Sequence, residues 1–264
     1  MSGVTDDQSL PLPDPTTPPS PPRPTDPVGP PPPGGRWADQ LRRFEPPAWR
    51  RRTRGERRWS VTLALLVAIC VQLALPKQLT ISPHWLLPAL ELLLMAALVV
   101  ANPHLRLERQ TALLRALALL LAGAVSVANG GSAVLLVRDL LRSHSELDPT
   151  ALLMAGAGVW LTNIIAFSLW YWEWDRGGPA ARAMGTHAYP DLLFPQMQQQ
   201  GIAPPDWEPH YPDYLFVAFT NATAFSPTDT LPLSRWTKLL MTMQSMVSLL
   251  TLALVIARAV NVLQ

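Results

Sequence analysis

Long apolar runs constrain this chain most. Five runs each hold about 17 to 25 mostly apolar residues, enough for a helix to cross a bilayer core of about 30 Å. They cover residues 59–75, 85–101, 113–137, 151–172 and 236–260. We therefore expect an all-α polytopic membrane protein with about five transmembrane helices, of which residues 59–172 hold four. The first two runs are short, and their alternative is a helical hairpin that spans only partly. Buried helices of a soluble domain are the other alternative.

Residues 1–40 form a proline-rich segment. Between Pro11 and Pro33 more than half of the residues are proline, and the rest are mostly polar. Such a composition cannot bury a core, so we expect a disordered cytoplasmic tail. A solvated spacer is the simplest interpretation, and docking of the tail on an aromatic groove through polyproline II geometry is the alternative.

An arginine-rich juxtamembrane segment, residues 41–58, precedes the first apolar run. Arginines in this position hold their end of a helix in the cytoplasm and attract anionic lipid head groups. The expected lipid contacts are Arg50, Arg51, Arg52, Arg54, Arg57 and Arg58. Trp49 among them indicates an interfacial segment on the membrane. The same charges would suit a nucleic-acid arm, but no recognition fold accompanies them, so no nucleic-acid partner is expected.

Five crossings from a cytoplasmic N-terminus place the C-terminus outside the cell membrane. The irregular loop expected at residues 173–212 then lies inside, together with Arg176 and Arg182. Before it, Trp170, Tyr171, Trp172 and Trp174 indicate an aromatic belt at the water interface. The odd number of crossings also places the segment that follows the loop on the cytoplasmic side. A four-crossing arrangement would place that segment outside.

The segment 213–262 carries a recognisable order of residues. Phe219, Thr220 and Thr223 have the spacing Phe-Thr-x-x-Thr, and Asp229 and Pro232-Leu233-Ser234 follow before a long apolar helix. This order resembles the re-entrant pore helix, filter loop and inner helix of a two-helix potassium-channel module. It also resembles an uncharacterised bacterial integral-membrane family with the same Asp-Tyr-Leu-x-x-x-Phe-Thr loop. The resemblance implies a pore-like helix and loop before the last transmembrane helix, and a possible homo-oligomer.

The filter chemistry departs from that pattern. Ala224, Phe225, Ser226, Pro227 and Thr228 stand where a potassium filter has Thr-Val-Gly-Tyr-Gly. A potassium filter is a ladder of backbone carbonyls, and its glycines adopt angles that other residues reach only with strain. Pro227 also lacks an N–H and fixes its own φ. We therefore predict a degenerate pore loop without potassium selectivity, with these candidate residues: Thr220, Thr223, Ala224, Phe225, Ser226, Pro227, Thr228 and Asp229.

Polar and charged residues within the apolar runs are the other candidates. In the last helix, Gln244, Ser248, Thr251 and Arg258 fall on one stripe that could line a water path, or form a polar seam against neighbouring helices. Glu91 lies inside the second apolar run, where an unpaired carboxylate costs a few kcal/mol. It is a candidate ion or proton group, and the alternative is a shallow helix end where it reaches head-group water.

The sequence contains no motif typical of an enzyme. The five histidines lack metal-ligand spacing, Cys70 is the sole cysteine, and neither a nucleophile elbow nor a phosphate loop is present. We expect no catalysis, cofactor or metal. Two functions are compatible with this pattern: a channel-like protein that conducts ions without potassium selectivity, and a non-conducting membrane scaffold whose proline-rich tail recruits a partner.

Overall fold

The computed structural model describes residues 46–101, 112–140, 149–199, 201–226 and 229–262, all within one unit, Pro46–Gln264. The predicted tail, residues 1–40, therefore lies outside the described residues. Helices dominate the described chain. The elements in chain order are η1 (Ala48–Arg50), α2 (Trp59–Ala74), η2 (Lys77–Leu79), α3 (Leu86–Ala101), α4 (Ala112–Leu140), α5 (Pro149–Trp174), η3 (Asp175–Gly177), α6 (Pro179–Met184), β1 (Leu192–Leu193), α7 (Pro195–Gln198), α8 (Tyr211–Ala224), β2 (Leu231–Pro232) and α9 (Arg235–Val262).

Each of the five apolar runs forms a helix, but the helices differ in length. By length and composition, α4, α5 and α9 are long and apolar enough to cross a membrane. The other two, α2 and α3, have 16 residues each, or about 24 Å at 1.5 Å per residue. The fold therefore shows three membrane-spanning candidates and two shorter apolar helices. The two shorter helices are compatible with the alternative that the first two runs form a helical hairpin that spans only partly.

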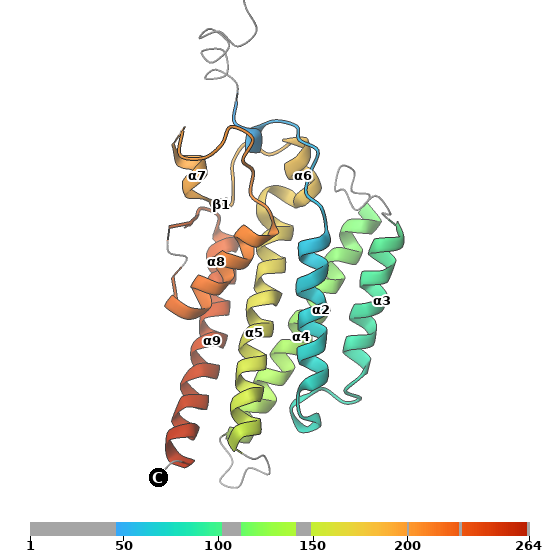
Figure 1. Cartoon of the computed structure of the whole chain (residues 1–264), viewed down its shortest axis with the longest axis vertical. Helices are drawn as coiled ribbons and strands as arrows, with labels where there is room; N and C mark the ends of the chain where they lie inside the picture. Colours follow the sequence, from blue (N-terminus) through green and yellow to red (C-terminus); the bar gives the residue numbers. More distant parts are fainter. Residues whose placement is uncertain (1–45, 102–111, 141–148, 200, 227–228, 263–264) are drawn as a thin grey trace, which may run out of the picture. The chain divides into compact units, whose positions relative to one another are not determined.

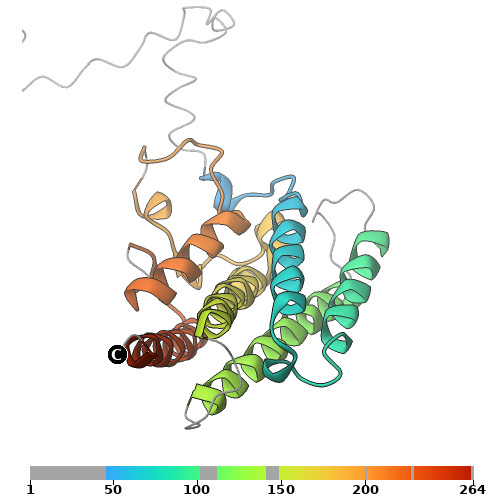
Figure 2. The same cartoon turned by 60° about the horizontal axis from the view of Figure 1, so that its bottom comes forward.

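Helix α5 lies at the centre of the bundle. Figures 1 and 2 show it between α2 and α4 on one side and α8 and α9 on the other. Small residues bring its backbone close to these neighbours. A Cβ built on Gly156 would lie 2.5 Å from Cγ2 of Val255 in α9, so no larger residue fits this crossing unchanged. On the α4 side, Ala118 and Ala122 are buried.

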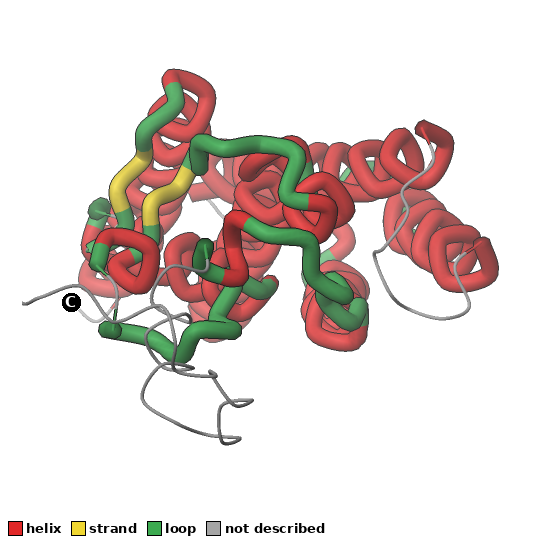
Figure 3. Tube along the Cα trace, turned by 90° about the horizontal axis from the view of Figure 1, so that it is seen from above, coloured by secondary structure: helices red, strands yellow, loops and turns green. Residues whose placement is uncertain are grey.

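Short elements cover one end of the bundle. η1, α6, α7 and β1 gather where α2 begins and α5 ends, whereas the C-terminal end of α9 lies at the opposite end (Figure 1). β1 pairs antiparallel with β2, with Leu192 opposite Pro232, and Figure 3 shows the two strands side by side. We call this end, residues 46–58 together with 175–210 as far as described, the cap.

Helix α8 starts at the cap. His210 is its N-cap residue, and the Asp213 carboxylate accepts a hydrogen bond from the His210 N–H at 2.8 Å, as a capping box requires. Its 14 residues span only about 21 Å, and it packs between α5 and α9. Helix α8 thus approaches the bundle from the end that carries the juxtamembrane arginines.

Two sequence expectations near this end are wrong. The irregular loop does not begin at residue 173, because α5 continues to Trp174 and Glu173 is 2% exposed. Two of the four residues expected in an aromatic belt are also interior, because Tyr171 and Trp172 are 2% and 1% exposed. The aromatic run faces its own protein because α5 is surrounded by four other helices, a property that composition alone does not indicate.

Candidate functional site

The predicted pore-loop residues lie at the end of α8. Hydroxyl groups of Thr220 and Thr223 donate to carbonyls of their own helix, with Thr220 Oγ1 3.0 Å from the Val217 oxygen. Ala224 ends the helix, and Phe225 has φ 51°, a left-handed C-cap that few non-glycine residues adopt. Ser226 and Asp229 are exposed, and residues 227 and 228 lie outside the described residues.

The polar stripe of α9 faces into the protein. Gln244 and Ser248 are fully buried, and Thr251 is 2% exposed. Ser248 Oγ donates to the Ala222 carbonyl of α8 at 2.8 Å, and Thr251 Oγ1 donates to Val247 of its own helix at 2.7 Å. The Arg258 side chain lies outside the described part of the chain. This arrangement corresponds to the polar-seam interpretation of the stripe.

Gln244 is the centre of that seam. Its Oε1 accepts from the Tyr171 hydroxyl at 2.6 Å and from Asn221 Nδ2 at 2.9 Å, and its Nε2 donates to the Ala218 carbonyl at 2.8 Å. The three partners come from α5 and α8, so one side chain joins three helices. Asn163 Nδ2 extends the seam by donating to the Gln244 carbonyl at 3.4 Å. Buried networks of this kind fix the relative positions of helices when their groups are paired.

A second polar centre lies in the cap, at Asp175. Its Oδ2 accepts from the Tyr214 hydroxyl at 2.6 Å, and its Oδ1 accepts from the backbone N–H of Asp191 at 2.9 Å. Asp175 is 1% exposed. The guanidinium of Arg182 donates to its backbone carbonyl at 3.0 Å and lies 4.9 Å from the Tyr214 ring. Asp175 therefore joins the end of α5, the β1 segment and α8.

The juxtamembrane segment from Pro46 to Arg58 is docked on the cap. Trp49 is 5% exposed, and its carbonyl accepts a hydrogen bond from Arg176. Thr53 N donates to the Ala183 carbonyl at 2.8 Å, and Thr53 Oγ1 donates to Glu208 at 2.8 Å. Trp49 thus packs on protein, which corrects its assignment to a membrane-surface segment.

The juxtamembrane arginines divide into two groups. Arg58 is 7% exposed and lines a cavity between the helices, so it is not a free head-group contact as the sequence suggested. It is buried because it is the N-cap residue of α2, which packs on the end of α5. The remaining members of the predicted set are exposed: Arg50, Arg51, Arg52, Arg54 and Arg57.

Ionisable groups in the cap also contact each other. His210 Nε2 lies 3.6 Å from Glu208 Oε1, and the His210 side chain is 48% exposed. The hydrogen bond with Glu208 raises the pKa of His210 above its ordinary value of 6.5, with smaller contributions from Glu56 and Asp213. The protonated imidazole is thereby favoured in the folded state.

Glu91 pairs with a neighbouring helix. It is fully buried, and both carboxylate oxygens lie 3.1 Å from Nε2 of Gln72 in α2. The side chain therefore faces α2, where protein atoms surround it, and not head-group water. Among the residues that the structure describes, no three His, Cys, Asp or Glu side chains gather as a metal site.

Sequence reasoning missed Asp175, Glu173 and Glu56 as buried or bridging groups. It placed Glu173 and Asp175 in an irregular loop and singled out only the arginines and Trp49 in the segment that holds Glu56. The one available signal was Glu173, an acid within an aromatic run that was otherwise apolar. Comparison with protein-family models, curated proteins and solved structures finds no match.

Proposed function

We propose that this chain is a non-conducting membrane scaffold that holds its N-terminal arm at a fixed place on one end of a helical bundle. In this proposal α2, α3, α4, α5 and α9 make five crossings of a bacterial inner membrane, with the cap in the cytoplasm. The proline-rich residues 1–40 recruit a partner protein. The observation that supports this function best is the docking of Pro46–Arg58, in which Trp49 is buried against Arg176.

Two consequences of that docking favour a scaffold. The segment from Pro46 to Arg58 has a defined place on the cap, because Trp49 and Thr53 both bond to the cap backbone or side chains. Its last anchored residues also connect directly to α2, so a force on the tail passes to the transmembrane region. A loosely tethered tail would need neither a buried tryptophan nor a buried arginine beneath it.

The polar seam supports the absence of a conduit within one chain. A water path along α9 needs polar side chains that face a channel, but Gln244 and Ser248 are fully buried and bonded to α8. The side chains that α9 exposes are mostly apolar, as Leu239, Met243 and Leu250 illustrate. Such a face suits lipid or another helix better than hydrated ions.

A conduit between copies is the second candidate, because α8 has the length and position of a re-entrant pore helix. It is too short to cross a bilayer of about 30 Å and ends in an exposed turn at Thr223–Ser226. Four such turns around an axis would form a short pore without a carbonyl ladder. This candidate predicts potassium and sodium flux of similar size.

Ion flux into liposomes distinguishes the two candidates. Purified full-length protein is reconstituted, and potassium and sodium entry is compared with protein-free liposomes. The scaffold predicts no added flux, whereas a conduit predicts flux that falls in Asp229→Asn, because a negative charge at the mouth is lost. Flux that depends on Asp229 would replace the scaffold by the conduit.

Crosslinking in cells tests the recruiting role. A photo-crosslinking residue at Ser20 should give a discrete adduct with a partner, and the yield should fall in Trp49→Ala, which frees the docked segment. Trp59→Ala is the matched control, because Trp59 is 63% exposed. Equal yields in the wild type and in Trp49→Ala would contradict the role of docking.

A further inference from the structure

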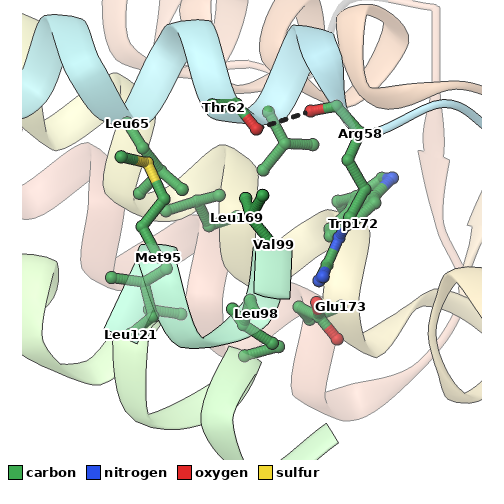
Figure 4. A pocket seen from close by; sticks show the side chains of 13 residues that line it. Arg58, Thr62, Leu65, Met95, Leu98, Val99, Leu121, Leu169, Trp172 and Glu173 are labelled. Carbon is green, nitrogen blue, oxygen red and sulfur yellow. Dashed lines mark hydrogen bonds between the residues drawn. The ribbon is translucent and has the colours of Figure 1, made fainter. Parts of the chain in front are cut away.

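A partly open cavity lies between α2, α3, α4 and α5 close to the cap. Its volume is about 30 Å³, room for one or two water-sized groups. Aliphatic side chains such as Leu65, Met95 and Leu98 line most of it. Figure 4 shows Arg58 and Glu173 together at one end and the aliphatic residues at the other. The cavity thus has a charged end and an apolar end.

Glu173 is an unsatisfied acid at the charged end. It is 2% exposed, and among the residues that the structure describes none donates a hydrogen bond to either carboxylate oxygen. A buried carboxylate without donors is costly, and a bound group with N–H or O–H donors would remove that cost. The volume beside it accepts a group of the size of an ammonium.

The charges around Glu173 restrict the ligand further. Arg58, Arg182 and Arg115 all interact electrostatically with its carboxylate. Arg182 is engaged by the carbonyls of Trp172 and Asp175, whereas Arg115 is exposed on the first turn of α4. The surrounding arginines would repel a simple cation, and the Glu173 carboxylate would repel a simple anion. A ligand with an amine next to an anionic group satisfies both.

We propose that this cavity binds the head group of an aminophospholipid from the surrounding bilayer. The primary ammonium of the lipid enters the cavity and donates to Glu173, and its phosphate lies beside the exposed Arg115. An ammonium has three N–H donors, whereas a trimethylammonium has none and is larger. The site therefore distinguishes phosphatidylethanolamine from phosphatidylcholine.

A bilayer lipid fits the cavity better than a soluble amine because the helices around the cavity have apolar outer surfaces. Helices α2 and α3, which enclose the cavity on its outer side, expose apolar side chains outward, among them Leu63 at 55% and Leu93 at 66%. Acyl chains can lie along these faces while the head group reaches inward. Arg115, which donates to the phosphate, lies on the first turn of α4, at a helix end of the kind that meets the head-group layer.

Native mass spectrometry of the full-length protein tests the proposal. The protein is delipidated in detergent and given an equimolar mixture of phosphatidylethanolamine, phosphatidylcholine and phosphatidylglycerol. We expect about tenfold more bound phosphatidylethanolamine than phosphatidylcholine, the size expected for one buried charged hydrogen bond. Equal binding of the three lipids, or preference for phosphatidylglycerol, would overturn the proposal.

Variants locate the preference at Glu173. Glu173→Gln should abolish it, whereas Glu91→Gln should keep it, because Glu91 is the other buried carboxylate of these helices but already pairs with Gln72. Ala122→Val fills the cavity without changing its charge and should also abolish the preference. This second variant keeps the test decisive if Glu173→Gln does not fold. An unchanged preference in either of the two cavity variants would refute the site.

A soluble head group distinguishes the two sources of the amine. Glycerophosphoethanolamine has the same amine and phosphate without acyl chains, and we expect it to compete at least about tenfold more weakly than the lipid, because it gains no contact with the apolar faces. Competition as strong as that of the lipid would assign the site to a soluble amine and overturn the membrane source.

Discussion

The carboxylate of Glu56 accepts a hydrogen bond from the indole Nε1 of Trp172 at 2.8 Å, across 116 residues of sequence. The same carboxylate accepts from the Tyr211 N–H at 2.8 Å, where α8 begins. One side chain of the docked segment thus joins α5 to α8. A carboxylate at a helix N-terminus also interacts favourably with the helix dipole. The cap and the bundle are held together at this point.

Replacing Glu56 should therefore loosen the cap. Glu56→Ala leaves the indole of Trp172 and the N–H of Tyr211 without their acceptor, and we expect a loss of about 1–3 kcal/mol of stability. Thermal unfolding in detergent measures it. Asp206→Ala, an exposed acid of the same end, serves as the control and should change little. Equal melting temperatures for the two variants would contradict the bridging role.

The close crossing of α5 and α9 gives a steric prediction. Gly156→Ala places a methyl group against Val255 and should cost about 1–3 kcal/mol, because overpacking forces backbone shifts. Gly123→Ala is the matched control, since a Cβ there meets nothing within 4 Å. The control should be neutral or slightly stabilising, because alanine favours helix more than glycine does. Melting temperatures of both variants in one detergent decide the point.

The polar seam should be sensitive to loss of its central residue. Gln244→Leu leaves the Tyr171 hydroxyl and the Asn221 amide without their shared acceptor, and we expect about 2 kcal/mol or more of destabilisation. Met243→Leu, one residue earlier and 49% exposed, is the control. If Gln244 instead lined a hydrated path, the leucine variant would keep its melting temperature.

The contact between His210 and Glu208 predicts a pH dependence. Because the folded-state pKa of His210 is raised above 6.5, its contribution is complete below pH 6.5 and is lost as the pH rises through the raised value. Half of this side chain is exposed, so the effect is small. The melting-temperature difference between wild type and His210→Gln should shrink from pH 5.5 to pH 8.5. A difference that grows over this range would refute the assignment.

The direction of insertion is also testable. Reporters attached before Pro46 and after Val262 should report opposite sides of the membrane, with the first in the cytoplasm, because an odd number of crossings separates them. Replacing Arg50, Arg51, Arg52, Arg54 and Arg57 by glutamine should weaken this preference. Both reporters on one side would require an even number of crossings.

The helices were predictable because long apolar runs have few other solutions in a chain of this kind. The boundaries of α3 and α9 lie within two residues of the apolar runs. A helix at the position of α8 was expected from the resemblance of residues 213–262 to a pore-helix module. The contacts within the candidate sites were not predictable, because they join residues far apart. Glu56 and Trp172 illustrate this limit, since neither residue type nor local spacing indicates that they meet.

The lengths of α2 and α3 have a consequence for the lipid around the protein. On the five-crossing arrangement, these two helices offer about 24 Å of apolar surface to a hydrocarbon layer of about 30 Å. This hydrophobic mismatch requires local thinning of the bilayer by about 6 Å, or tilting of the longer neighbours to match. The thinning affects one flank only, because α4, α5 and α9 are long enough to span. The protein would then deform its membrane asymmetrically and collect in thinner regions of it.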